Sequence, residues 1–383
     1  MLHYLDNSAT TRLLPEVADA VCRTLKETFG NPSSLHPPGV SARALIDEAR
    51  EKIASALCVN AEEIVFTSGG TESNNTAIFG VARLYAKRGR HIVTSAIEHP
   101  SVLEPLSRLA AEGFEVEHVP PLQDGSVPAD EVLTRVRKDT VLVTMMHVNN
   151  EVGSVLPIDA VGRGLREFSP RPVFHVDAVQ SFGKYRIEPE GFGIDLLSAS
   201  GHKIHGPKGT GFLYVRRGLE IPPYMLGGGQ ERGFRSGTEN VHGIVGMAEA
   251  ISALEKANFW GRVKPLRCRI EEGAMRIPGC SVIGPKEEGL YAPHILSLRV
   301  EGVRGEVLVR FLGAEGVCVS SGSACHGHRG GPSPVLAALG MKSKEAEQVI
   351  RVSLSVDNDE SDADAFLSSL EKAVSHFRRV FRS

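Results

Sequence analysis

Residues 140–146 read TVLVTMM and residues 173–177 read VFHVD, two short apolar runs in a region where such runs alternate with helical patterns. The pattern continues on both sides, with further apolar runs at 64–67 (IVFT), 91–94 (HIVT), 195–197 (DLL) and 211–215 (GFLYV). Helical patterns follow the first two of these runs, up to Lys87 and from Val102 to Ala111. Strands that alternate with helices predict a largely parallel sheet covered on both faces. The sequence therefore predicts an α/β fold.

The last third of the chain has a different pattern. Helical patterns at 241–254 and 263–275 are followed by strands at 295–300 and 350–354 and by helices at 306–312 and 363–377. This mixture indicates a smaller α+β domain. We therefore predict a large domain over residues 15–257 and a small domain formed by residues 1–14 and 258–383, the latter carrying a loop at about 320–334.

The composition excludes several classes of function. Hydrophobic residues make up 42% of the 383 residues, and 43 basic residues against 46 acidic ones leave a formal charge of −3. General binding of nucleic acids, or attachment to an anionic membrane, needs clustered positive charge, so neither partner is expected. No stretch approaches the ~18 apolar residues of a membrane helix. The first residues have no pattern of a signal peptide, so we expect a cytoplasmic protein.

The six cysteines are too scattered for a disulfide framework in a chain of this length. They are Cys22, Cys58, Cys268, Cys280, Cys318 and Cys325. Because none forms a CxxC pair, a metal site made of cysteines alone is not expected. Cys318 precedes an apolar valine and is interpreted as a packed strand residue. Cys325 is different, because Ser, Gly and Pro surround it.

Polar residues follow the apolar runs at the ends where a parallel sheet gathers its ligands. Ser68-Gly69-Gly70-Thr71-Glu72 lies between a strand and a helix. Its glycines allow close approach of a ligand, and the helix N-terminus favours an anion. The spacing is not that of a P-loop, and a single phosphate fits it better. A capped helix start after a tight turn is the alternative.

A carboxylate and a lysine follow two other runs. Asp177 ends one buried run, where a carboxylate is costly unless a cation or a donor meets it; capping of the next helix is the alternative. Lys203 follows Ser198-Ala199-Ser200-Gly201-His202, before several Gly and Pro residues. A desolvated lysine there can attack a carbonyl, whereas Lys184 and Lys208 are interpreted as surface charges. The predicted phosphate-binding stretch, the carboxylate and the lysine together indicate a site for pyridoxal phosphate.

Ten longer motifs resemble the cysteine desulfurases of the NifS and IscS type, which have the class-V aminotransferase fold. They are YLDNSATT (4–11), GNPSSLH (30–36), FTSGGTESNN (66–75), EHPSVL (98–103), MHVNNEVGSVLPI (146–158), HVDAVQSFGK (175–184), SGHKIHGPKG (200–209), GGGQERGFRSGTEN (227–240), SSGSAC (320–325) and RVSLS (351–355). The resemblance runs nearly end to end. It implies the fold type I of pyridoxal-phosphate enzymes, with a mostly parallel seven-stranded sheet in the large domain.

The resemblance also implies roles for single residues. Lys203 matches the Schiff-base lysine, Asp177 the partner of the pyridine nitrogen and His99 the histidine stacked on the ring. Further cofactor-binding matches are Gln180 at the phenolic oxygen and Gly70, Thr71, Ser200 and His202 around the phosphate. Thr238 matches a residue that reaches the phosphate of the partner subunit, which implies a homodimer. Asn150 and Arg351 match residues that hold the substrate carboxylate, although Arg351 is also open to interpretation as a surface ion pair.

In the family the residue at the position of Cys325 is the nucleophile. The resemblance implies that its thiolate takes the sulfur of L-cysteine as a persulfide, that alanine leaves, and that the sulfur passes to an acceptor such as an iron–sulfur scaffold protein. His326, His328 and Arg329 can help to hold the thiolate. The expected catalytic residues are thus Cys325, Lys203 and His99.

Three alternatives stay open. The stretch CHGHRGGPSPVL at 325–336 resembles selenocysteine lyases, whereas Pro100 resembles the NifS-type enzymes, so a lyase acting on L-selenocysteine is the second choice. A plain aminotransferase would keep Lys203 and Asp177 and would not need Cys325. A metal carrier could use Cys325, His326 and His328, but such sites usually need a fourth ligand, and no metal is expected.

Overall fold

A seven-stranded sheet forms the centre of the computed structural model, which describes residues 2–322 and 333–380. Its strand order is β2-β8-β7-β6-β5-β3-β4. The strands are β2 (Ile64–Thr67), β3 (His91–Ser95), β4 (Glu115–Val119), β5 (Thr140–Met146), β6 (Val173–Asp177), β7 (Leu196–Ser200) and β8 (Gly211–Val215). In this sheet β8 runs in the direction opposite to that of the other six strands. The predicted α/β fold with a mostly parallel seven-stranded sheet is confirmed.

The central strands of the sheet are largely apolar because helices cover both faces of the sheet. Leu142 of β5 and Leu196 of β7 pack with α3 (Gly70–Tyr85) and α4 (Pro100–Ala111) on one face. The next residues, Val143 and Leu197, belong to the cluster on the other face. That face is covered by α5 (Ala129–Leu133), α6 (Ile158–Leu165) and α8 (Val241–Lys256). Successive side chains of a strand point to opposite faces, so a strand buried on both sides has no polar alternation.

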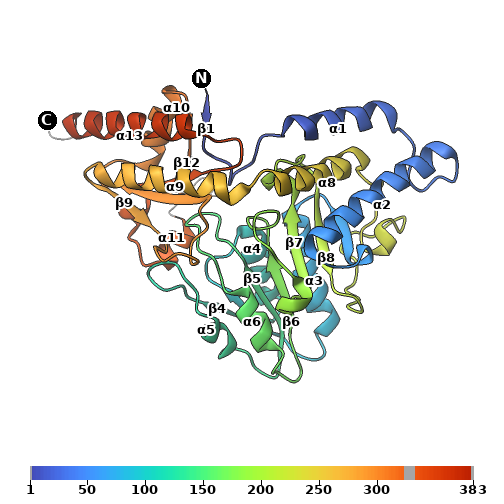
Figure 1. The fold of residues 1–383 in the computed structure, drawn as a ribbon. Helices are drawn as coiled ribbons and strands as arrows, with labels where there is room; N and C mark the ends of the chain where they lie inside the picture. Colours follow the sequence, from blue (N-terminus) through green and yellow to red (C-terminus); the bar gives the residue numbers. More distant parts are fainter. Residues whose placement is uncertain (1, 323–332, 381–383) are drawn as a thin grey trace.

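Two long helices near the N-terminus extend away from the sheet. They are α1 (Pro15–Glu27) and α2 (Pro37–Leu57), and both pack against α8. Figure 1 shows them as an arm at one end of the molecule, with the connecting loop at its tip. Phe29 and Leu35 in that loop are 84% and 96% exposed.

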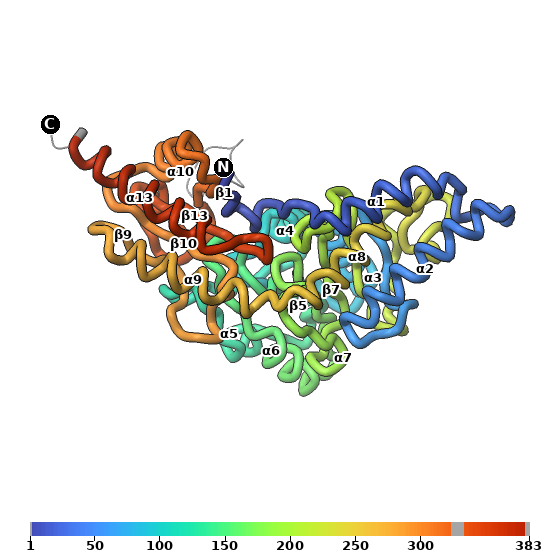
Figure 2. Tube along the Cα trace, turned by 45° about the horizontal axis from the view of Figure 1, so that its top comes forward, coloured from blue at the N-terminus to red at the C-terminus, as the bar shows by residue number. Residues whose placement is uncertain are grey.

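The C-terminal part forms a second, antiparallel sheet of order β12-β13-β10-β9. Its strands are β9 (Cys280–Ile283), β10 (Ile295–Val300), β12 (Ser320–Ser321) and β13 (Val349–Ser353); its helices are α9 (Phe259–Arg276), α10 (Gly305–Ala314) and α13 (Glu360–Val380). The N-terminal strand β1 (His3–Tyr4) pairs with β11 (Val317–Cys318), so the first residues lie beside this part. Figure 2 shows α9 running along the boundary between the two parts. The division into residues 15–257 and 1–14 plus 258–383 stays a prediction.

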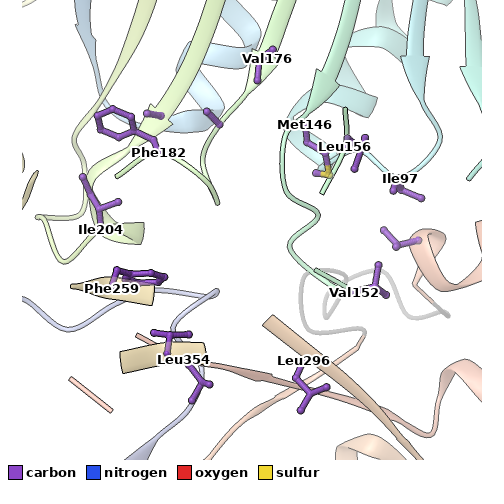
Figure 3. Close-up of a cluster of buried hydrophobic side chains, with 14 of the residues drawn as sticks. Ile97, Met146, Val152, Leu156, Val176, Phe182, Ile204, Phe259, Leu296 and Leu354 are labelled. Carbon is purple, nitrogen blue, oxygen red and sulfur yellow. The ribbon is translucent and has the colours of Figure 1, made fainter. Parts of the chain in front are cut away.

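A continuous hydrophobic cluster joins the two parts. Phe182 and Ile204, from turns beyond β6 and β7, lie close to Phe259 and Leu354 of the C-terminal part (Figure 3). All four side chains are almost fully buried. Because the loops at the carboxyl ends of the sheet are packed in this way, the polar residues that they carry are held in place.

The sequence-based boundaries differ from the structure in a few places. β7 reaches Ser200, so Ser198 and Ser200 lie inside the strand and not after its end. Strand β4 was not predicted, because EVEHV is half polar and pairs with the rest of the sheet only through β3. The lone apolar run at 211–215 gives no sign that β8 runs antiparallel to β2 and β7.

Candidate active site

A cavity of about 350 Å³ lies where the carboxyl ends of the central strands face the C-terminal part. This volume is within the range of ~300–1,000 Å³ that is usual for small-molecule sites. Ten of the predicted residues line it: Gly70, Thr71, His99, Asn150, Asp177, Gln180, Ser200, His202, Lys203 and Arg351. The structure thus brings together side chains from six separate regions of the sequence.

The N-terminus of α3 provides an anion-binding corner of this cavity. Gly69 precedes the helix with a φ of +148°, a conformation that favours glycine. A Cβ atom on Gly70 would lie 2.5 Å from Cγ2 of Val179, so this position also needs glycine. Thr71, Ser200 and His202 border the same corner. Unpaired N–H groups at a helix start, with hydroxyl groups around them, suit a phosphate group.

Asp177 lies at the end of β6 and is only 5% exposed. Oδ2 accepts a hydrogen bond from Nδ2 of Asn74 (2.8 Å), and Oδ1 accepts one from the backbone N–H of Val179 (3.0 Å). Among residues 2–322 and 333–380 this carboxylate forms no ion pair. A buried carboxylate held only by neutral donors is suited to a cationic partner within the cavity.

Lys203 lies in a short 3₁₀ turn that directly follows β7. Its Nζ donates hydrogen bonds to the carbonyl oxygens of Ser8 (2.6 Å) and Ala9 (2.7 Å). The side-chain amide of Gln180 donates to the same carbonyl oxygen of Ser8 (3.0 Å). The N-terminal segment therefore positions both Lys203 and Gln180 at the cavity wall.

His202 and His99 complete the part of the wall that was predicted to bind a cofactor. Burial lowers the pKa of His202 to about 4, and the neighbouring Lys203 acts in the same direction, so the imidazole is neutral near pH 7. Its Nδ1 lies 3.2 Å from the Thr10 hydroxyl. His99 caps α4, and its Nδ1 accepts the backbone N–H of Ser101 (3.1 Å).

Arg351 lies on β13 and is 3% exposed, so the alternative of a surface ion pair is wrong. Nη1 donates to the backbone oxygen of Asn150 (2.8 Å), and Nη2 pairs with Oδ1 of Asp6 (2.9 Å). Nε has no hydrogen-bond partner among the described residues. Burial raises the pKa of Asp6, although Arg351 acts in the opposite direction. Arg351 thus has donor capacity left for a carboxylate in the cavity.

The interpretation of Lys184 as a surface charge is wrong, whereas Lys208 is exposed as predicted. Lys184 is 8% exposed, and its Nζ donates to the backbone oxygen of Gln180 (3.2 Å). The same oxygen lies 3.1 Å from Nε2 of His294. Burial lowers the pKa of Lys184 to about 7, and Lys203 adds to this shift. The turn after β6 passes under the cavity and buries Lys184. The residues around Lys184 in the sequence do not indicate this burial.

Of the predicted site residues that the structure describes, one does not line the cavity. Thr238 lies exposed in the segment 227–240, which a buried ion pair between Glu231 and Arg50 (2.8 Å) anchors to α2. Cys325 lies outside the described residues, as do His326 and His328. In the described ranges no group of three or more His, Cys, Asp or Glu side chains is placed to hold a metal ion. No helix in those ranges has both the length and the apolar character to span a bilayer.

The sequence-based search missed several polar residues of the cavity. Asp6, Ser8 and Ser101 line it, and Asn74 lies directly behind Asp177. All four fall inside the family-like motifs, but none follows an apolar run in the way that marked Asp177. Their positions depend on contacts between distant segments, such as the pair between Asp6 and Arg351.

The buried carboxyl group of Glu98, next to His99, gives a testable pH dependence. Glu98 accepts hydrogen bonds from the Ser95 hydroxyl and from the backbone N–H of Met146 (2.9 Å). Burial raises the pKa of Glu98 to about 8, from an ordinary value of 4.5, in spite of these bonds. The folded protein therefore keeps a proton up to about pH 8 that the unfolded chain releases above pH 4.5. This contribution to stability is lost as the pH rises towards 8.

We predict that Glu98→Gln removes this contribution to the pH dependence. From pH 5 to pH 8 the free energy of unfolding of the parent should fall relative to that of the variant, because Glu98 can lose a proton and the amide cannot. Denaturant unfolding of both proteins at four pH values in this range measures the difference. A difference that stays constant with pH would show that Glu98 is ionised in the folded protein.

Comparison with known proteins agrees with this geometry. Residues 3–366 match the profile of the family described as aminotransferase class-V. The chain belongs to the class-V aminotransferase family. It is 43% identical to cysteine desulfurase IscS of Dictyoglomus turgidum over 98% of this chain and 95% of the relative. The predicted resemblance to cysteine desulfurases of the IscS and NifS type is confirmed.

Solved structures of relatives have the same fold. A NifS-like protein, 39% identical, superposes with a TM-score of 0.92 and covers 98% of this chain and 100% of its own. A structure described as SspA in complex with cysteine, 35% identical, has a TM-score of 0.81 over 92% of this chain and 98% of its own. The cavity described above thus belongs to an enzyme fold with relatives that are cysteine desulfurases.

Proposed function

We propose that this chain is a pyridoxal-phosphate-dependent cysteine desulfurase, which converts L-cysteine to L-alanine and keeps the sulfur as a persulfide on Cys325. The observation that carries the proposal is the content of one cavity: a buried carboxylate without a cationic partner in the described ranges, a lysine amine and a buried arginine. The cysteine desulfurases among the relatives support the reaction assigned to it.

The residues of the cavity fit pyridoxal phosphate. Thr71, Ser200 and His202, with the N–H groups at the start of α3, would hold the phosphate. Asp177 would accept a hydrogen bond from the protonated pyridine nitrogen and so keep it protonated, and Lys203 would bind the aldehyde carbon. When bound, the cofactor supplies an electron sink for bonds at the substrate's Cα.

The opposite wall of the cavity suits the carboxylate of an amino acid. The Nε of Arg351 has no partner within residues 2–322 and 333–380, and bonds to Asn150 and Asp6 fix the guanidinium group in position. We assign the substrate carboxylate to Arg351 and Asn150. The relative solved with cysteine supports a small amino acid as the ligand of this fold.

The protein groups then have separate tasks. Lys203 takes the proton from Cα and returns a proton later, because its amine lies at the end of β7 beside the cavity. The thiolate of Cys325 attacks the substrate's sulfur: an S–S bond forms, the Cβ–S bond breaks, and its electron pair remains with the carbon fragment. This fragment takes up a proton and leaves as alanine. An acceptor, which we propose to be an iron–sulfur scaffold protein, removes the terminal sulfur.

We further propose that two chains form a homodimer in which Thr238 of each reaches the phosphate site of the other. Phe29, Leu35 and Leu226 are between 84% and 96% exposed, and contact with a second chain would remove their apolar surface from water. The buried bidentate pair of Glu231 with Arg50 fixes the segment that carries Thr238. Sedimentation should give twice the mass of the chain. A monomer with full activity would contradict this assignment.

A cytoplasmic location stays a prediction.

The proposed function is tested by alanine formation without a keto acid. Purified enzyme loaded with pyridoxal phosphate should form alanine from L-cysteine and a reductant alone. A plain aminotransferase would need a keto acid as amino-group acceptor. If alanine appears only after a keto acid is added, the desulfurase proposal fails and the aminotransferase alternative holds.

We predict that Asp177→Asn lowers the rate of alanine formation by about 100-fold or more while cofactor still binds. The amide keeps the size of the side chain but cannot balance a positive charge on the pyridine nitrogen. Steady-state rates and cofactor absorbance measure the two effects separately. A rate equal to that of the parent would contradict the role assigned to Asp177.

A further inference from the structure

A chain of hydrogen bonds runs from Asp177 to His99 through two side chains that have no role in the proposed function. Nδ2 of Asn74 donates to Oδ2 of Asp177 (2.8 Å) and to the hydroxyl of Ser101 (2.9 Å). This hydroxyl lies 2.8 Å from Nδ1 of His99. Asn74 is completely buried and Ser101 is 8% exposed, so water does not compete freely for these bonds.

The directions of the bonds follow from which atoms can only donate or only accept. A carboxylate oxygen accepts, so the amide nitrogen of Asn74 faces Oδ2 of Asp177. The same nitrogen donates to Ser101, whose own hydrogen is thereby left for His99. The backbone N–H of Ser101 also donates to Nδ1 of His99 (3.1 Å). Nδ1 therefore accepts from two donors and cannot carry a proton itself.

We infer that Ser101 and Asn74 are positioning residues that hold His99 as the tautomer with its proton on Nε2 and tie its orientation to the charge of Asp177. The inference rests on the proposed function, which places His99 and Asp177 against the same cofactor ring. Neither residue touches the reacting atoms in this account. Each acts through the group that it orients, since hydrogen bonds to one ring nitrogen set the tautomer of the other.

The experiment reads the tautomer of His99 by ¹⁵N NMR of histidine-labelled, full-length protein, with and without pyridoxal phosphate. The resonance of His99 is identified by its absence in His99→Gln. In the parent the Nε2–H form should dominate. In Ser101→Ala only the backbone donor remains, and we expect the ratio of the tautomers to shift by about fivefold towards Nδ1–H.

Ser101→Thr is the matched control because it keeps a hydroxyl group at the same position. It should retain the tautomer ratio of the parent. An unchanged ratio in Ser101→Ala, or equal shifts in both variants, would overturn the inference. Asn74→Ala, which frees the hydroxyl of Ser101 to rotate, should also lower the share of the Nε2–H form. An unchanged share would show that Asn74 does not influence the tautomer of His99.

A kinetic readout separates positioning from a general loss of structure. In Ser101→Ala we expect kcat for L-cysteine to fall about tenfold with KM unchanged within about twofold, because Arg351 and Asn150 are not affected. A change in KM alone would contradict the inference. The parent enzyme decides the proposed function separately: if it forms no alanine from cysteine, that proposal fails whatever the tautomer of His99.

Discussion

Lys203→Ala is expected to reduce alanine formation from L-cysteine by at least about 1,000-fold, which is the largest effect that a single substitution at this site should have. The variant lacks both the amine that would bind the cofactor and the base that would move the α-proton. The Nζ of Lys203 is held by the carbonyl oxygens of Ser8 and Ala9, and alanine at this position removes the amine from the cavity wall. Alanine is measured by chromatography at saturating cysteine.

Two controls make this result specific. Lys138→Ala changes an exposed lysine in the turn before β5, away from the cavity, and should leave the rate unchanged. Circular dichroism and sedimentation of Lys203→Ala should equal those of the parent, since the side chain lies at the cavity wall and not in the core. If Lys203→Ala retains more than a trace of the parent rate, the assignment of Lys203 is wrong.

Cys325→Ala is expected to abolish alanine formation from L-cysteine while some release of selenium from L-selenocysteine remains. In the proposed reaction no other group takes the sulfur. The C–Se bond is weaker than C–S, and selenolate is a better leaving group, so elimination from selenocysteine can proceed without a protein thiol. Alanine and released selenide are measured for both substrates.

Cys318→Ala is the matched control, since Cys318 is a half-buried strand residue seven positions earlier. Its rate with L-cysteine should stay close to that of the parent. Full activity of Cys325→Ala on L-cysteine would contradict the role of Cys325 as the nucleophile. Equal losses in both variants would show that the cysteines act through structure alone.

The part of the site that the sequence predicts is the part that parallel strands bring together. Asp177 and Lys203 follow neighbouring strands, β6 and β7, whose carboxyl ends share one edge of the sheet. Ser68 to Glu72 begin the helix after β2, close to the same edge. Apolar runs locate such ends, so a ligand site at this edge follows from local patterns alone.

The rest of the site depends on contacts that no local pattern contains. Asp6 pairs with Arg351 across almost the whole chain because β1 lies beside the C-terminal part. Asn74 occupies the second turn of α3, where only the packing of that helix against β6 brings it to Asp177. Lys184 was wrongly expected at the surface, because its burial results from the turn beyond β6 and from His294. Tertiary packing decides all three positions.

The fold likewise has elements that local sequence patterns predict and elements that they miss. The strands buried on both faces, such as β5, have long apolar runs and were predicted close to their true bounds. The edge strand β4 was missed because it is half polar, which fits side chains that are mostly exposed or half-buried.

The central claim is that L-cysteine is the substrate, and the ratio of kcat/KM for L-cysteine to that for L-selenocysteine tests it most directly. The enzyme loaded with pyridoxal phosphate is assayed with each amino acid in parallel, with a reductant to release the persulfide. We predict sustained conversion of L-cysteine to alanine, with Cys325 required for it. A kcat/KM for L-selenocysteine higher by several orders of magnitude, with L-cysteine almost unreacted, would contradict the claim and identify a selenocysteine lyase.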